Sequence, residues 1–248
     1  MALRWAAAWC LIALVAGGCR KEALLVSAAI SLKEPVEEIA RHYEREHAGE
    51  HVALNFAASG ALARQIEGGA PVDVFLSADE RSMLRLRARG RVSAFRHFAS
   101  NRLVLITARG QLAGLRFTTL AGDPRLKRLA IGTPAEVPAG EYATTLLRAL
   151  GELDALEARL IPASNVRQVL DYVARGEADA GIVYATDARL ASAVEIRDTQ
   201  PPDPPLDIFY ASAVVDSTRR PAAAAAFDEL VHGPVGHGVL AAHGFLPP

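Results

Sequence analysis

The chain has 248 residues, of which 51% are hydrophobic and 22% are charged. This composition is typical of a globular protein with one large domain or two smaller ones, and it excludes a disordered or fibrous chain. Lysine and arginine number 27 against 28 aspartates and glutamates, and aromatic residues make up only 6%. Without a surplus of basic residues or many aromatic rings, the sequence argues against nucleic-acid binding.

The first residues have the features of an export signal. Arg4 precedes an uncharged apolar run at residues 5–16, which is too short to span a membrane. Small residues and then Cys19 follow this run. The arrangement resembles a bacterial lipoprotein signal, in which the chain is cut before the cysteine and the cysteine is lipidated. We therefore predict a signal peptide at residues 1–18 and a lipid anchor on Cys19, with a plain secretory signal as the alternative.

Short apolar runs alternate with helical patterns through the rest of the chain. Apolar residues at steps of three and four predict helices around residues 36–43 and 166–173, the second ended by Gly176. Strands that alternate with helices predict an α/β fold with parallel sheets covered on both faces. The predicted strands are Leu24–Ala29, Val52–Ala57, Val72–Ala78, Leu103–Ala108, Leu129–Gly132, Gly181–Ala185 and Phe209–Val215.

Four predicted helices begin just after a strand or a short loop, near Ser31, Ser59, Ala139 and Val166. In an open parallel sheet such starts lie at the carboxyl ends of the strands, where ligands bind. Each helix start offers unpaired N–H groups and a partial positive charge, so converging starts can bind an anion without lysine or arginine. Ser31 and Glu34 also have the spacing of a capping box, and an ordinary N-cap is the alternative role for each serine.

Several motifs stand in order along the chain: Ala28–Leu32, Phe56–Ile66, Gly69–Asp79, Val137–Ala143, Asn165–Arg167 and Gly181–Asp187. Together they resemble the periplasmic molybdate-binding proteins of ABC importers. The resemblance implies the two-lobed α/β clamshell of periplasmic binding proteins, with two crossover strands and the oxyanion in the cleft. One lobe would comprise residues 23–100 plus 207–248 and the other residues 101–206, with crossovers near 103–108 and 205–211.

The resemblance also implies which residues bind the oxyanion. Ser31, Ser59 and Tyr184 would donate their hydroxyl groups, and Ala139 and Val166 would donate backbone N–H groups. Molybdate at neutral pH is a dianion with four acceptor oxygens and no hydrogen to donate. A site made of donors alone, without a carboxylate, suits such an anion and disfavours protonated phosphate.

The implied function is capture of molybdate or tungstate outside the cytoplasm and delivery to an ABC permease. We expect a monomer that uses no cofactor and catalyses no reaction. The same fold binding sulfate or another small anion is one alternative. A secreted serine hydrolase is the other, with Ser59 as the nucleophile, Asp207, and a histidine among His232, His237 and His243. The residues around Ser59 lack the glycines of a nucleophile elbow, which argues against the hydrolase.

Overall fold

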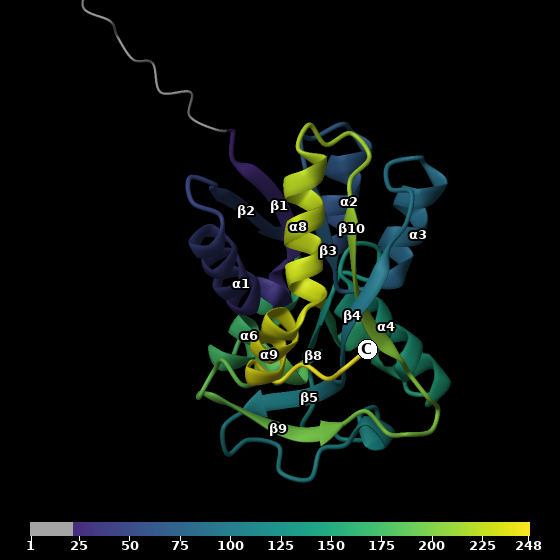
Figure 1. Cartoon of the computed structure of the whole chain (residues 1–248). Helices are drawn as coiled ribbons and strands as arrows, with labels where there is room; N and C mark the ends of the chain where they lie inside the picture. Colours follow the sequence, from purple (N-terminus) through teal and green to yellow (C-terminus); the bar gives the residue numbers. More distant parts are fainter. Residues whose placement is uncertain (1–21) are drawn as a thin grey trace, which may run out of the picture.

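The computed structural model describes residues 22–248, which form two five-stranded sheets packed with helices (Figure 1). The first sheet occupies the upper half of Figure 1 and the second the lower half. The predicted signal peptide and Cys19 lie outside the described residues. Within residues 22–248, no helix is long and apolar enough to cross a membrane.

The first sheet has the strand order β2-β1-β3-β10-β4. Strands β1, β2 and β3 are parallel, whereas β10 runs antiparallel to both β3 and β4. The bounds are β1 Leu24–Ala29, β2 Val52–Ala57, β3 Val74–Ser77, β4 Arg96–Asn101 and β10 Ile208–Val214. Five helices pack on this sheet, namely α1 (Lys33–Glu46), α2 (Ser59–Glu67), α3 (Glu80–Ala88), α8 (Pro221–His232) and α9 (Pro234–Ala242).

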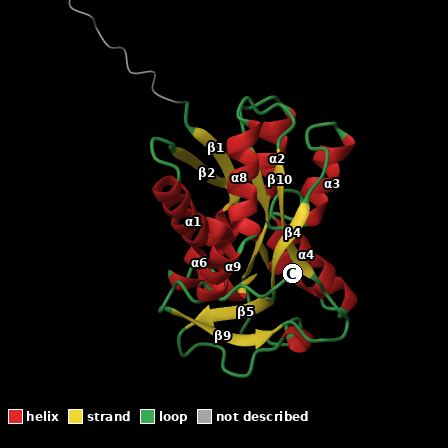
Figure 2. Ribbon diagram, in the orientation of Figure 1, coloured by secondary structure: helices red, strands yellow, loops and turns green. Residues whose placement is uncertain are grey.

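Alternation along β3 divides the core of the first sheet between its two faces. Phe75 packs with Leu62 of α2 and Met83 of α3 in one apolar cluster. Its neighbours Val74 and Leu76 belong to the larger cluster that contains the apolar residues of α1, α8 and α9. Because successive side chains of a strand point to opposite faces, a short buried strand can support helices on both sides. Figure 2 shows these helices around the upper strands.

The second sheet has the strand order β7-β6-β8-β5-β9. Strands β6, β7 and β8 are parallel, whereas β5 runs antiparallel to β8 and β9. The bounds are β5 Leu103–Ala108, β6 Leu129–Gly132, β7 Leu160–Ala163, β8 Ala180–Tyr184 and β9 Val194–Thr199. The helices of this half are α4 (Pro138–Ala149), α6 (Val166–Ala174) and the short α5 (Leu153–Leu156) and α7 (Ala185–Ala188).

The chain passes twice between the sheets. It leaves the first sheet at the end of β4, Asn101, and enters the second at Leu103, the start of β5. It returns through the proline-rich segment 200–207, which joins β9 to β10. The first sheet is therefore built from two segments far apart in the sequence, whereas the second comes from the continuous stretch 103–199. The two halves are joined at adjacent strand ends.

The predicted α/β class is confirmed, and four predicted strands have the bounds seen in the structure. The prediction of purely parallel sheets was wrong, because the strands next to each crossover run antiparallel to their neighbours. Strands β4, β7 and β9 were not predicted from the sequence. All three are edge strands, and their polar or proline-containing sequences lack the continuous apolar run that marks a buried strand.

Candidate functional site

The five residues predicted to bind an anion lie around one pocket between the two sheets, with about 210 Å³ of empty space including its opening to solvent. We call the residues contributed from the first-sheet side the first wall: Ala29, Ile30, Ser31, Ala57, Ala58, Ser59 and Ala78. We call those contributed from the second-sheet side the second wall: Val137, Pro138, Ala139, Val166 and Tyr184. The walls follow the carboxyl ends of parallel strands, as expected for ligand sites in α/β sheets.

Both serines of the first wall are buried and accept a hydrogen bond from a protein group. Ser59 is the first residue of α2, and its Oγ accepts from the Ala78 N–H at 3.0 Å. The Oγ of Ser31 accepts from the Tyr210 hydroxyl at 3.2 Å. A hydroxyl oxygen that already accepts keeps its single hydrogen to donate elsewhere. Each serine can therefore donate to a group in the pocket.

Neither serine caps a helix. The N-cap of α2 is Ala58, which forms no side-chain cap, and Ser31 lies inside the 3₁₀-helix η1 (Ile30–Leu32). The capping-box prediction for Ser31 and Glu34 was therefore wrong. The Glu34 carboxylate instead pairs with Arg167, which comes from the second sheet's side of the molecule. The sequence spacing was compatible with a cap, but the tertiary partner takes the carboxylate.

Tyr184 ends β8 and is 1% exposed. Its hydroxyl points across the pocket to the Ala78 carbonyl oxygen at 3.5 Å, a long and weak hydrogen bond. Burial raises the pKa of Tyr184 well above its usual value. The phenol thus stays protonated at neutral pH and can donate to an acceptor stronger than the distant carbonyl.

The second wall offers backbone N–H groups at two helix starts. Ala139 is the second residue of α4 and Val166 is the first residue of α6. The first N–H groups of a helix have no partner within it, and the helix dipole adds partial positive charge there. The side chain of Asn165 caps α6 by accepting from the Gln168 N–H at 3.0 Å, so the Val166 N–H is not used by the cap.

Glycine makes the α4 start possible. A Cβ on Gly140 would lie 1.8 Å from the Gly132 carbonyl oxygen, and a Cβ on Gly132 would lie 2.3 Å from a methyl of Val137. Real atoms do not approach so closely, so α4 can begin against the end of β6 only because neither residue has a side chain. This contact places Ala139 in the pocket lining.

The pocket lining carries no charged side chain among the described residues. A charged cluster next to the pocket links the two halves of the molecule. Arg167, the residue after Val166, donates to both Glu34 oxygens at 2.6 and 3.0 Å and to Asp187 Oδ1 at 2.6 Å. Asp187 is fully buried, and burial raises its pKa to about 6 although Arg167 opposes this shift. Its Oδ2 has no hydrogen-bond partner within residues 22–248.

The walls also meet at the pocket rim. The Gly60 N–H donates to the Glu136 carbonyl oxygen at 3.0 Å, and Arg64 pairs with the Glu136 carboxylate at 2.8 Å. A Cβ on Gly60 would lie 2.7 Å from that carbonyl oxygen. Glycine at this position thus allows the two halves to touch.

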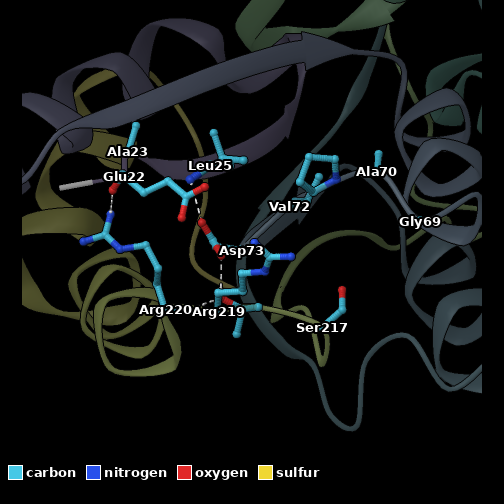
Figure 3. Close-up of a pocket in the computed structure, with 12 residues that line it drawn as sticks. Glu22, Ala23, Leu25, Gly69, Ala70, Val72, Asp73, Ser217, Arg219 and Arg220 are labelled. Carbon is cyan, nitrogen blue, oxygen red and sulfur yellow. Dashed lines mark hydrogen bonds between the residues drawn. The ribbon is translucent and has the colours of Figure 1, made fainter. Parts of the chain in front are cut away.

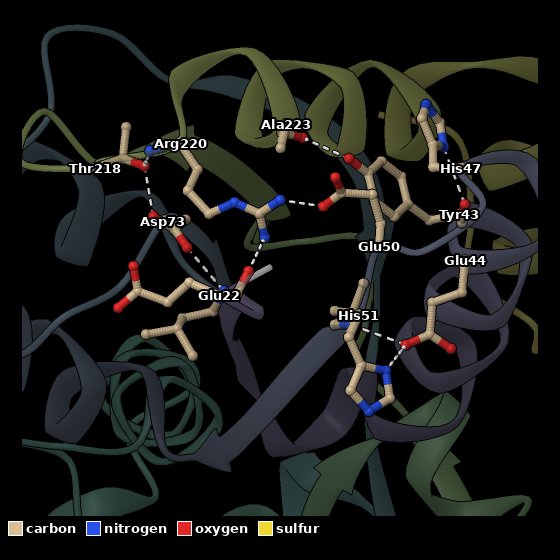
Figure 4. Close-up of polar contacts among 12 residues, drawn as sticks. Glu22, Tyr43, Glu44, His47, Glu50, His51, Asp73, Thr218, Arg220 and Ala223 are labelled. Carbon is tan, nitrogen blue, oxygen red and sulfur yellow. Dashed lines mark hydrogen bonds and ion pairs between the residues drawn. The ribbon is translucent and has the colours of Figure 1, made fainter. Parts of the chain in front are cut away.

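A larger cavity lies where the chain enters the first sheet, lined by residues that include Glu22, Asp73 and Arg219 (Figure 3). Two of its charged groups, Asp73 and Arg220, have partners within the protein. Asp73 accepts from the Leu25 N–H and the Thr218 hydroxyl. Arg220 pairs with the Glu50 carboxylate and donates to the Glu22 carbonyl oxygen (Figure 4). This network ties the start of β1 to the loop after β10, which is a structural role.

Two of the three histidines considered for a hydrolase, His232 and His243, have partners other than Ser59. His232 Nε2 lies 2.8 Å from the hydroxyl of Ser212, which is 1% exposed. His243 pairs with Glu38. No group of three or more histidine, cysteine, aspartate or glutamate side chains in the described part of the chain could hold a metal ion. The geometry therefore does not favour the hydrolase alternative.

Some residues of the site were not predicted from the sequence. Ala78 contributes both its N–H and its carbonyl oxygen, Tyr210 contacts Ser31, and Asn101 contacts Tyr210. The only signal for Ala78 was its place directly after a buried strand, at the same sheet edge as the serines. Nothing in the sequence marks Tyr210, which lies 179 positions from Ser31.

Comparison with known proteins places the chain in a family. Residues 24–246 match the family of bacterial extracellular solute-binding proteins. The molybdate-binding protein ModA of Escherichia coli is 36% identical over 90% of this chain and 88% of its own length. The putative ABC transporter substrate-binding lipoprotein YvgL of Bacillus subtilis is 34% identical over 91% of this chain and 87% of its own length. The chain belongs to this solute-binding family.

The fold is also similar to the solved structure of a molybdate-binding protein. The periplasmic molybdate-binding protein of Azotobacter vinelandii superposes with a TM-score of 0.81 at 28% identity, covering 91% of this chain and 99% of that one. The predicted clamshell fold of periplasmic binding proteins is thereby confirmed.

Proposed function

We propose that this extracellular solute-binding protein captures molybdate or tungstate and delivers it to an ABC permease. The observation that carries the proposal is the convergence of five hydrogen-bond donors from distant segments on one small pocket. The donors are the hydroxyls of Ser31, Ser59 and Tyr184 and the N–H groups of Ala139 and Val166. The relatives named as molybdate-binding proteins support the choice of anion.

The chemistry of the lining suits an unprotonated oxyanion. Every proposed contact donates a hydrogen bond, and charge-assisted bonds to an anion are about twice as strong as neutral ones. Hydrogen phosphate carries a hydrogen that needs an acceptor, and the lining has no carboxylate to supply one. Sulfate has the same charge and acceptors as molybdate but is smaller, so its exclusion depends on pocket size.

Capture would couple to closure of two lobes, residues 23–100 plus 207–248 and residues 101–206. The serines come from the first wall and the other three donors from the second. Only a closed arrangement presents all of them to one anion, so the anion binds that state more tightly and increases its population. No step of this process is a reaction, and we assign no catalytic role to the chain.

Titration calorimetry with sodium molybdate, tungstate, sulfate and phosphate tests the proposal. We expect tight binding of molybdate and tungstate and at least a hundredfold weaker binding of the other two. A preference for sulfate would favour the alternative anion instead. If none of the four anions gives a heat of binding, the proposal of oxyanion capture is wrong.

We also propose that Cys19 holds the exported protein at a membrane surface. A relative is named as a lipoprotein, and the pocket lies on a separate part of the chain from Cys19. Cys19→Ser should therefore release the protein from membranes and leave molybdate affinity unchanged. The measurement is membrane fractionation of cells, followed by calorimetry on the released protein. A processed Cys19→Ser protein that still sediments with membranes contradicts the lipid anchor.

A further inference from the structure

A chain of buried polar groups leads from the first crossover to the pocket. Its members are Asn101 at the end of β4, Tyr210 on β10 and Ser31 after β1. They are 5%, 0% and 3% exposed, respectively. Only Ser31 lines the pocket. The other two are not among its lining residues. Tyr210 contacts the lining at two places, through its hydrogen bond to Ser31 and through its ring, whose centroid lies 5.7 Å from that of Tyr184. A test must therefore separate an effect through Ser31 from one through Tyr184.

The hydrogen bonds of this chain have a direction, because it begins at a backbone group. The Arg102 N–H donates to Asn101 Oδ1 at 2.9 Å, which identifies the other amide atom as Nδ2. Nδ2 lies 2.9 Å from Thr186 Oγ1 and 3.4 Å from the Tyr210 hydroxyl oxygen. An amide nitrogen can only donate, so the Tyr210 oxygen accepts at that contact. The Tyr210 hydrogen is then left for Ser31 Oγ, 3.2 Å away.

The direction carries through to the pocket. Ser31 Oγ accepts from Tyr210, and its own single hydrogen is left to point at a bound anion. We propose that Tyr210 is a positioning residue that fixes Ser31 as a hydrogen-bond donor in the anion site. This inference rests on the proposed function, since it gives Ser31 the role of a donor to the oxyanion. Burial also raises the pKa of Tyr210 well above its usual value, so its hydroxyl keeps the hydrogen it donates.

The other serine shows why Tyr210 is the informative position. Ser59 Oγ is fixed in the same sense by the Ala78 N–H, a backbone group that no side-chain substitution removes. At Ser31 the equivalent donor is a side-chain hydroxyl, which Tyr210→Phe deletes while keeping the ring and its packing. The same variant leaves the Ser31 hydroxyl in the pocket but free to rotate.

A double-mutant cycle measured by calorimetry with molybdate tests the proposal. Tyr210→Phe should weaken molybdate binding by about threefold to tenfold, the range for one neutral hydrogen bond. In a Ser31→Ala background the same substitution should change affinity by less than about twofold, because the group it orients is gone. Tyr172→Phe, on α6 and outside the pocket lining, is the matched control and should bind as the wild type does.

Equal weakening in both backgrounds would overturn the proposal, because Tyr210 would then act on binding by another route. Wild-type affinity of a folded Tyr210→Phe protein would overturn it as well. If circular dichroism shows that Tyr210→Phe does not fold, Asn101→Ala replaces it in the same cycle, since it removes the donor that turns the Tyr210 hydroxyl. Absence of molybdate binding by the wild-type protein would instead remove the proposed function, so the two failures are distinguishable.

Discussion

The two walls of the pocket present hydrogen-bond donors that are held in different ways. The first wall uses the hydroxyls of Ser31 and Ser59, whose directions are set by Tyr210 and by the Ala78 N–H. The second wall uses N–H groups at the starts of α4 and α6, together with the Tyr184 hydroxyl. The first wall is thus controlled by side-chain chemistry and the second mainly by how closely helices pack on strands.

This difference determines how each wall can be altered. A hydroxyl can be deleted without moving the backbone, so substitutions in the first wall should change affinity and leave the fold intact. A backbone donor can be moved only by changing the packing beneath it, so substitutions under the second wall should change affinity and stability together. Tyr184 is the exception in the second wall, because its donor belongs to a side chain.

The largest effect should come from the packing beneath the second wall. In Gly140→Ala the new Cβ would lie 1.8 Å from the Gly132 carbonyl oxygen, so the start of α4 must shift and carry the Ala139 N–H with it. We expect molybdate affinity to fall by about a hundredfold or more and the free energy of unfolding to fall by about 1–3 kcal/mol. Calorimetry measures the molybdate affinity, and denaturant unfolding measures the free energy of unfolding.

Gly122→Ala is the control for that variant, because the nearest atom to its added Cβ is the Thr119 carbonyl oxygen at 3.8 Å. It should behave as the wild type in both measurements. Unchanged affinity and stability of Gly140→Ala would contradict the packing account of the second wall.

The next effect should come from the side-chain donor of the second wall. Tyr184→Phe keeps the buried ring and removes one O–H donor to a dianion, a loss of roughly 1.5–3 kcal/mol or about ten- to a hundredfold in affinity. Stability should barely change, in contrast to Gly140→Ala. Calorimetry on the folded variant, with Tyr172→Phe alongside, measures this. Wild-type affinity of Tyr184→Phe would remove Tyr184 from the site.

The smallest effect concerns the pH dependence of stability, through the charged cluster of Glu34, Arg167 and Asp187. The pKa of Asp187 is raised to about 6 from an ordinary 3.8, so the folded state favours its protonated form. Its contribution to stability is therefore complete below pH about 4 and is lost as the pH rises through about 6. Between pH 5 and 7.5 the wild type should lose roughly 1 kcal/mol of unfolding free energy that Asp187→Asn does not lose.

Denaturant unfolding of both proteins at several pH values measures this difference. Parallel pH profiles of the wild type and Asp187→Asn would show that Asp187 does not titrate in this range. Molybdate affinity should change little between pH 6 and 8 in either protein, since the proposed donors are hydroxyl and N–H groups.

Much of the fold could be predicted because its central strands are buried on both faces and therefore read as continuous apolar runs. The central strands Leu24–Ala29, Leu103–Ala108 and Leu129–Gly132 were predicted with their observed bounds. The edge strand β2, Val52–Ala57, was predicted as well, because its sequence is largely apolar although it is partly exposed. The edge strands β4, β7 and β9 have no such run. The reversed direction of β5 and β10 depends on where the chain crosses between sheets, which no local pattern reports.

The sequence by itself determined the class of fold, the family and the five candidate donors, because these depend on local periodicity and on short motifs. Only the tertiary structure decided which partners those donors have. Ser31 meets Tyr210 and Glu34 meets Arg167 across 179 and 133 positions, distances over which spacing in the sequence carries no information. The capping-box prediction was wrong for the same reason: a local pattern shows which bonds a side chain can form, and the packing of distant segments selects among them.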